Sequence, residues 1–240
     1  MLHELLNKCG IYYAKRRYMP RGIDWLCDLQ RLHVGGHAPM VFDIGANKGQ
    51  TTSKVLQYFP NARVHAFEPV LETFNDFRQK FGTKVGVNSN QLAVSDSCGS
   101  ASILVSSNSE LSHLVMEPDQ SREKRTNVEI VETTSIDAYC AKKGIKHIDI
   151  LKTDTEGHDL PVLKGAERAL RSGQVDWILT EVTFDPLDDS HSKFDAIQTF
   201  LKDRGFAVYC FYDHFFTHED LLHHYCNALF VRKALSIGVV

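Results

Sequence analysis

Strand-like and helix-like segments alternate from residue 40 onward, and this alternation limits the folds that the chain can adopt. Short apolar runs such as "MVFDIG" (40–45) and "HIDILKTD" (147–154) have the length and composition of buried strands. Between such runs lie segments with helical spacing of apolar residues, for example "VLETFNDFRQKFG" (70–82). Strands that alternate with helices predict a parallel, doubly wound α/β sheet with helices on both faces.

The remaining elements follow the same pattern. Further strands of the sheet are expected at "ARVHAFEP" (62–69), "NQLAVSD" (90–96) and "VDWILTEV" (175–182). Helices are expected over 135–144, with a Ser135 cap and a Gly144 stop, over 158–173 and over 193–205. Extra short strands, either paired or crossing at one end, are expected at "SASILVSS" (100–107) and "NVEIVETTSI" (127–136).

The last two strand-like runs, "FAVYCFY" (206–212) and "YCNALFVRK" (225–233), are joined by a segment that need not hold a crossover helix. They are therefore expected to form an antiparallel hairpin at the edge of a mostly parallel sheet. Residues 1–39 look helical and irregular and end in "HVGGHAP", whose glycine pair and proline mark a break. We predict an N-terminal helical extension (1–39) and one α/β domain (40–240).

Composition excludes several classes of protein. The formal net charge of −3 gives no strong field for recruiting nucleic acid or an anionic membrane. No apolar run approaches the roughly 18 to 20 residues that span a bilayer, and the N-terminus lacks the apolar core of a signal peptide. The six cysteines are scattered, without a CxxC pair, which indicates reduced thiols and a cytoplasmic protein. The sequence leaves a homo-oligomer open.

The stretch "VFDIGANKGQTT" (41–52) marks the expected ligand site. In such a sheet, ligands bind beyond the carboxyl ends of the strands, where Asp43 ends the first strand. Gly45 and Gly49 bracket the turn into the next helix, and glycine there permits positive φ and close approach of a ligand. Asn47 stands where a dinucleotide-binding loop would need its second glycine, which argues against a nicotinamide cofactor.

Acidic residues follow three successive strands. Besides Asp43, Glu68 ends the second strand, where its carboxylate can accept hydrogen bonds from ribose hydroxyls, and Asp96 follows the third, beside an adenine amino group. An acid at position 43 would repel a pyrophosphate but suits a cationic ligand. The ligand that meets these demands is S-adenosylmethionine, which carries a sulfonium and an amino group beside adenosine.

At "IDILKTDTEGHDLPVLKGA" (148–166) the chain resembles the FkbM family of methyltransferases. The other matching pieces are "VFDIGANKGQTT", "HAFEPV", "LAVSDSCG" and "WILTEV", so that the resemblance covers about residues 40–182. It implies a Rossmann-like class I methyltransferase fold with S-adenosylmethionine as donor, and O-methylation, in many members on sugar hydroxyls. When the family's donor site is carried over to this sequence, the resemblance implies the residues Asp43, Gly45, Asn47, Gly49, Glu68 and Asp96.

Candidate catalytic groups concentrate in "KTDTEGHD" (152–159), at the end of the fourth strand. Methyl transfer to a hydroxyl needs aligned atoms and removal of a proton. Asp154 and Glu156 are expected to orient hydroxyls, and His158 to take the proton, although residues 156–159 also suit the cap of the next helix. Lys152 lies inside the strand and needs an acidic partner, either Asp43, Asp154 or Glu181.

Two further features leave alternatives open. Glu181 with Asp154, and Asp185 as a third ligand, permit a divalent cation, but the sequence does not predict one. His214 and His218 are four residues apart, yet no HExxH or CxxC motif accompanies them, so a connector without zinc is favoured. The polar segment "SSNSELSHLV" (106–115) is expected to reach over the donor pocket as a lid.

We therefore predict an S-adenosylmethionine-dependent O-methyltransferase that acts on a sugar hydroxyl of a glycan or glycosylated metabolite. The acceptor could also be a polyketide or another non-sugar alcohol. Other classes are a nicotinamide-dependent oxidoreductase, against which Asn47 argues, and a non-catalytic binding module, against which the run of strand-end acids argues. A nucleic-acid substrate is not expected, because no basic groove is evident.

Overall fold

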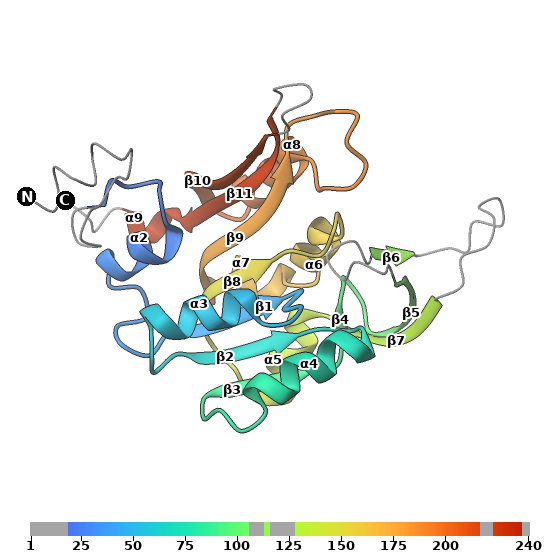
Figure 1. Cartoon of the computed structure of the whole chain (residues 1–240). Coiled ribbons are helices and arrows are strands. Elements are labelled where there is room, and N and C mark those ends of the chain that lie inside the picture. Colours follow the sequence, from blue (N-terminus) through green and yellow to red (C-terminus); the bar gives the residue numbers. More distant parts are fainter. Residues whose placement is uncertain (1–18, 106–112, 116–127, 217–222, 237–240) are drawn as a thin grey trace, which may run out of the picture.

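A computed structural model describes residues 19–105, 113–115, 128–216 and 223–236 of the chain, and it contains a central seven-stranded sheet (Figure 1). The spatial order is β10-β11-β9-β8-β1-β2-β3. The strands from β9 to β3 pair in parallel, whereas β11 is antiparallel to both β9 and β10. Their bounds are β1 (Met40–Ile44), β2 (Arg63–Phe67), β3 (Val87–Asn90), β8 (Ile148–Thr153), β9 (Val175–Thr183), β10 (Phe206–Phe216) and β11 (His223–Arg232).

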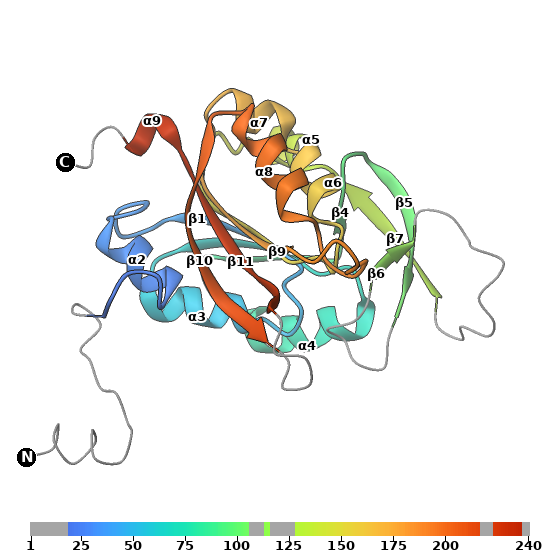
Figure 2. The same cartoon turned by 90° about the horizontal axis from the view of Figure 1, so that it is seen from above.

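Helices cover both faces of this sheet, as Figure 2 shows from above. One face carries α2 (Trp25–Arg31), α3 (Gln50–Tyr58) and α4 (Leu71–Phe81). The other face carries α5 (Ile136–Lys143), α6 (Asp159–Lys164), α7 (Glu167–Arg171) and α8 (Phe194–Lys202). A short helix, α9 (Lys233–Ser236), follows β11. The predicted doubly wound sheet and its antiparallel last strand are confirmed.

The period of two along each strand creates two hydrophobic cores, one on each face. In β1, Val41 packs with α2–α4, whereas its neighbour Phe42 packs with α5–α8, and both are fully buried. The described part of the predicted N-terminal extension belongs to the first of these cores, where Trp25 and Leu29 are buried. The central strands are therefore covered on both sides, as expected for a parallel sheet.

The "NQLAVSD" prediction is wrong in detail. The third strand of the central sheet is the more polar β3, and Ala93 and Val94 instead form β4 in a second, four-stranded sheet. The order there is β4-β7-β5-β6, with β5 (Gly99–Leu104), β6 (His113–Val115) and β7 (Val128–Thr134). The reason is that a short apolar run indicates a buried strand but not the sheet to which it belongs. The two predicted extra strands, β5 and β7, are confirmed, and they pair with each other in the antiparallel direction.

The helix predicted over 158–173 is split into α6 and α7 at Gly165. A Cβ at Gly165 would lie 2.1 Å from the carbonyl oxygen of Ser95, so this segment packs directly against the backbone after β4. By contrast, α5 has the predicted caps. The Ser135 side chain accepts a hydrogen bond from the amide of Ala138, and Gly144 is left-handed at φ 68°.

Several predictions concern residues outside the described ones. The lid expected at 106–115 is described only at 113–115, which form β6, and His218 of the histidine pair is also outside. Within the described residues, Cys27, Cys98, Cys140, Cys210 and Cys226 are free thiols, as predicted. No helix in the described ranges combines the length and the hydropathy that crossing a bilayer requires.

Candidate active site

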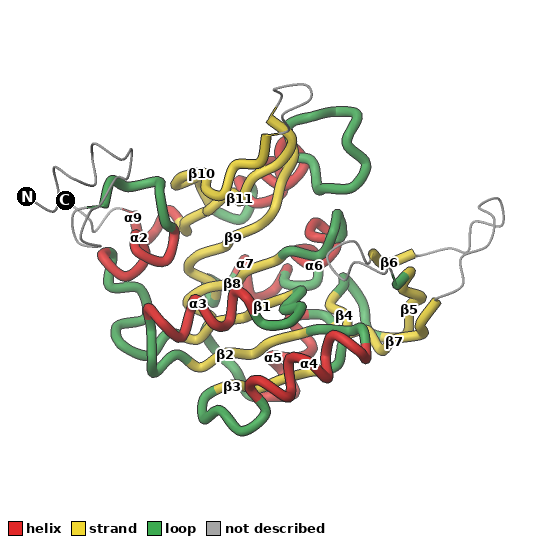
Figure 3. Tube along the Cα trace, in the orientation of Figure 1, coloured by secondary structure: helices red, strands yellow, loops and turns green. Residues whose placement is uncertain are grey.

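A cavity of about 510 Å³ opens at the carboxyl ends of β1, β2, β8 and β9. Figure 3 shows the loops after β1 and β8 at this edge of the sheet, and the amide of Asp154 donates a hydrogen bond to the carbonyl of Ile44 across them (3.1 Å). The β1–α3 turn, Glu68 and the end of β4 line one side. The "DTEG" turn after β8, Glu181, His191 and Tyr225 line the other side. The site lies where parallel sheets bind ligands.

Glu68 and the turn after β1 form one connected unit. One Glu68 oxygen accepts a hydrogen bond from the amide of Asn47 and the other from the amide of Val70, both at 3.0 Å. Asn47 itself is left-handed (φ 47°). Burial raises the pKa of Glu68 to about 7, although the two amide hydrogen bonds oppose this shift. The carboxylate lines the cavity, in the position that the sequence predicted for a ribose ligand.

The positive φ values expected for the two glycines of the turn are confirmed, and packing gives a further reason for glycine at both positions. A Cβ at Gly45 (φ 74°) would lie 1.8 Å from the carbonyl oxygen of Asp154, and one at Gly49 (φ 83°) would lie 2.3 Å from the Phe81 ring. Side chains are therefore excluded by protein atoms on the neighbouring strand tip and on α4. The glycines allow the β1 and β8 turns and α3 and α4 to pack closely.

Asp43 does not line the cavity, contrary to the expectation that it faces the crevice. Its side chain is fully buried, accepts a hydrogen bond from the Thr52 hydroxyl (2.7 Å) and lies 3.3 Å from the Lys152 ammonium. Lys152 also lies 3.3 Å from Asp154 and donates to the carbonyl of Gly45 (3.1 Å). Burial alone would lower the pKa of Lys152, but the carboxylates of Asp154 and Asp43 outweigh it and raise the pKa.

Three other predicted residues, Gly49, Asp96 and His158, are also outside the cavity wall. Asp96 is exposed and accepts hydrogen bonds from the hydroxyls of Ser95 (3.4 Å) and Ser97 (3.1 Å). The buried His158 places Nε2 2.9 Å from the Ser95 hydroxyl, and burial lowers its pKa. At this part of the wall the cavity is lined instead by the apolar side chains of Leu92, Ala93, Val94 and Ile103.

The opposite side of the cavity is acidic. Asp154 and Glu156 line it as predicted, and Glu181 comes from β9. Burial, followed by the nearby carboxylates of Asp154, Asp159 and Glu156, raises the pKa of Glu181 to about 9. Burial likewise raises the pKa of Asp159, which lies behind the turn, to about 6.

Sequence reasoning missed His191 and Tyr225. His191 belongs to the β9–α8 loop, and its ring stacks on Tyr225 of β11 with centroids 4.2 Å apart. The polar run "DDSHS" (188–192), in the loop that follows the fifth strand, was the available signal, because loops at that edge contribute to the site. Tyr225 had no such signal, since it lies in a strand that returns to the site from the far end of the chain.

The strand order and the single antiparallel strand, with a cavity at the strand tips, define a class I methyltransferase fold. The chain belongs to the FkbM methyltransferase family, because the family model "Methyltransferase FkbM domain" matches residues 43–208, more than half of the chain. The predictions of the family, of methyl transfer and of S-adenosylmethionine as the donor are thereby confirmed.

Two relatives carry methyltransferase names. The chain is 25% identical to 2-O-methyltransferase NoeI of Sinorhizobium fredii over 170 residues, which is 66% of this chain and 69% of that protein. It is 24% identical to Methyltransferase 1 of Beauveria bassiana over 185 residues, 70% and 72% of the two chains.

Solved structures resemble the chain more distantly. One is M. capricolum TrmK in complex with the natural cofactor product S-adenosylhomocysteine, with 9% identity, a TM-score of 0.47 and coverage of 88% of this chain and 70% of that one. The strand order and strand directions of the central sheet, and not these distant likenesses, define the fold.

Proposed function

We propose that the protein transfers the methyl group of S-adenosylmethionine to a hydroxyl oxygen of a sugar or a similar alcohol. The observation that carries this proposal is one cavity with two unlike walls. One wall offers the Glu68 carboxylate beside a helix-initiating turn and apolar side chains, which suits a nucleoside. The other wall offers carboxylates, which suit hydroxyl groups. The relative named as a 2-O-methyltransferase supports transfer to oxygen.

In this proposal the donor occupies the side formed by the β1–α3 turn and Glu68. The Glu68 carboxylate accepts hydrogen bonds from the ribose hydroxyls, and the apolar strip at Leu92–Val94 contacts the adenine. Gly45, Asn47 and Gly49 shape the turn. Asp43 does not contact the donor and contributes only indirectly, through its contacts with Lys152 and Thr52. Asp96 lies outside the cavity wall, where it accepts a hydrogen bond from Ser97.

Asp154 is the proposed proton acceptor, because it lines the cavity next to the turn after β1. The acceptor oxygen attacks the methyl carbon in line with sulfur, the carbon–sulfur bond breaks, and its electron pair stays on sulfur. The hydroxyl proton passes to the Asp154 carboxylate, and Glu156 orients the acceptor. His158 is assigned no proton transfer, since its Nε2 is occupied by Ser95.

The test is a screen for formation of S-adenosylhomocysteine with sugars, deoxysugars, glycans and macrolide-like alcohols. We expect turnover with a hydroxyl acceptor, and a fall in kcat of at least about 100-fold in Asp154→Asn, because a general base typically contributes a factor of this size. The KM for the donor should change little. Binding of S-adenosylhomocysteine without turnover on any acceptor would contradict the proposal and favour a binding module.

The affinity for S-adenosylhomocysteine is expected to rise by about tenfold between about pH 6 and about pH 8. Glu68 has its pKa raised to about 7, and only its ionised form can accept hydrogen bonds from both ribose hydroxyls. Below pH 7 the carboxyl must first lose its proton, so the affinity is lower there. Isothermal titration calorimetry at several pH values measures this dependence.

Glu68→Gln should weaken binding about 10- to 100-fold and remove the pH dependence, because hydrogen bonds to a charged acceptor are lost. Glu132→Gln is the matched control, since Glu132 is exposed on β7 and does not line the cavity. An unchanged pH dependence in Glu68→Gln would show that another group titrates.

The predicted cytoplasmic location and oligomeric state stay predictions.

A further inference from the structure

We propose that Glu156, Glu181 and His191 form a binding site for one divalent transition-metal cation in the acidic wall of the cavity. One ligand atom from each residue lies within 4.8 Å of the other two. They come from three separate places in the chain, namely the turn after β8, strand β9 and the β9–α8 loop. All three line the cavity, so that a cation there would be accessible to a bound molecule.

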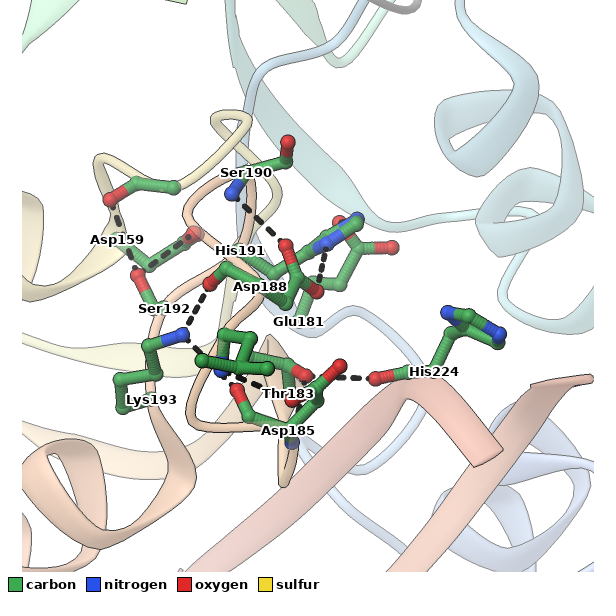
Figure 4. Close-up of polar contacts among 12 residues, drawn as sticks. Asp159, Glu181, Thr183, Asp185, Asp188, Ser190, His191, Ser192, Lys193 and His224 are labelled. Carbon is green, nitrogen blue, oxygen red and sulfur yellow. Dashed lines mark hydrogen bonds and ion pairs between the residues drawn. The ribbon is translucent and has the colours of Figure 1, made fainter. Parts of the chain in front are cut away.

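His191 is oriented as a metal ligand would be. Its Nδ1 lies 2.7 Å from a carboxylate oxygen of Asp188, which leaves Nε2 directed toward Glu181 at 3.6 Å (Figure 4). Metal-binding histidines usually donate their other ring N–H to a carboxylate, which fixes the tautomer and the ring orientation. Stacking on Tyr225, at an interplanar angle of 21°, holds the ring from a second side.

The loop that carries His191 is itself anchored. A second Asp188 oxygen accepts a hydrogen bond from the amide of Ser190 (2.8 Å), and Lys193 donates to the carbonyls of Asp185 (2.9 Å) and Asp188 (Figure 4). A Cβ at Gly157 would lie 2.8 Å from the carbonyl of Ser190. The two loops therefore touch through their backbones, next to Glu156 and His191, and the ligands are held together before any cation binds.

The charge of this wall favours a cation. The carboxylates of Asp154 and Glu156 line this wall together with that of Glu181, so several acidic groups gather around the proposed site. The nearby Lys152 ammonium is already paired with two other carboxylates, since it lies 3.3 Å from an oxygen of Asp43 and 3.3 Å from one of Asp154. The ligand set of two carboxylates and one imidazole combines groups that suit Mn²⁺ with one that suits other transition metals.

Two other groups in the described part of the chain are weaker candidates. In the group His147, Asp149 and Asp176, both carboxylates already bind protein donors, the amide of Met40 and the guanidinium of Arg232. In the group His214, His223 and Cys226, the two imidazoles hydrogen-bond to each other at 3.0 Å. Neither group lines the 510 Å³ cavity.

The role of the cation rests on the proposed function, whereas its binding does not. Three protein ligands leave coordination positions open, and two neighbouring hydroxyls of an acceptor can fill them as oxygen ligands. A cation that contacts the reacting hydroxyl makes it more acidic and fixes its orientation. This assigns the acidic wall to acceptors with adjacent hydroxyl groups, as in many sugars.

The test is titration of tag-free protein with Mn²⁺, followed by calorimetry and by the electron paramagnetic resonance signal of the free ion. We expect one tight Mn²⁺ per chain. His191→Asn and Glu181→Gln should each weaken its binding at least tenfold, and Asp188→Asn, which removes only the orienting carboxylate, about 10- to 100-fold. His147→Gln is the matched control and should leave binding unchanged, because it removes an imidazole from the rival group.

Binding of S-adenosylhomocysteine, measured on every variant, shows that the fold is intact. The absence of stoichiometric Mn²⁺ binding to the wild-type protein would overturn the proposal. So would a loss of binding in His147→Gln with retention in Glu181→Gln. Stoichiometric Mn²⁺ binding in a protein that methylates no alcohol would overturn the proposed function but support the site.

Discussion

Replacing Gly45 by alanine is expected to lower the free energy of unfolding by more than about 4 kcal/mol, a size that marks a backbone or core clash. The residue is left-handed at φ 74°, and an added Cβ would lie 1.8 Å from the carbonyl oxygen of Asp154. That atom is backbone, so it cannot rotate away as a side chain would. The two strand tips must separate, and Lys152 then loses its hydrogen bond to the carbonyl of Gly45.

Gly144→Ala is the matched control for this prediction. Gly144 is also left-handed, at φ 68°, but an added Cβ there would meet no atom within 4 Å. It should cost only about 1–2 kcal/mol, the penalty of the left-handed conformation itself. Urea denaturation of both variants measures the difference. A Gly45→Ala variant no less stable than Gly144→Ala would refute the close contact between the turns.

Gly45→Ala should also lose binding of S-adenosylhomocysteine, because the displaced turn carries the amide of Asn47 that holds Glu68. Calorimetry under conditions where the variant remains folded measures this loss. Gly144→Ala should bind as the wild type does, since it lies at the end of α5 outside the cavity wall. Retained affinity in Gly45→Ala would show that the donor site does not depend on this turn.

Lys152→Met is expected to destabilise the protein by about 3–5 kcal/mol, the usual cost of removing one partner from a buried ion pair. The lysine side chain is only 5% exposed, and it lies 3.3 Å from the fully buried Asp43. Without the ammonium, the Asp43 carboxylate keeps the Thr52 hydroxyl as a partner but has no charge opposite it. The free energy of unfolding at neutral pH measures the effect.

The double variant Lys152→Met/Asp43→Asn should be more stable than Lys152→Met alone, because it removes the uncompensated charge as well. In a double-mutant cycle the two changes should therefore be non-additive. Thr52→Val serves as a control that removes a partner of Asp43 without changing charge, and it should cost less than Lys152→Met. Additive losses would indicate that Asp43 and Lys152 act independently.

Local patterns were sufficient for much of the fold. The alternation from residue 40 predicted the parallel sheet, and "SIDAYCAKKG" predicted α5 together with both of its caps. The errors occurred where a strand had to be assigned to the neighbouring strand with which it pairs. The apolar run at Ala93–Val94 looked like a third strand, but it pairs with β7 in the second sheet.

The sequence predicted those site residues that come directly after a single strand of the sheet. Glu68, Asp154 and Glu156 line the cavity as the sequence indicated, because the end of each parallel strand points to the same edge. Asp43 was expected at that edge as well, but its side chain turns inward to Lys152 and Thr52. The two faces of a strand alternate, and a short motif does not reveal which face meets the ligand.

The sequence by itself indicated the strand and helix segments, the turn after β1 and the acids at the strand tips, since these follow from patterns of neighbouring residues in the chain. Only the tertiary structure decided that Gly45 packs against the backbone at the end of β8. It alone also decided that four residues meet in one wall of the cavity, namely Glu156, Glu181, His191 and Tyr225. The physical reason is the strand order. The pairing of β11 with β9 brings residues 181 and 225 to one edge, and no local pattern encodes that pairing.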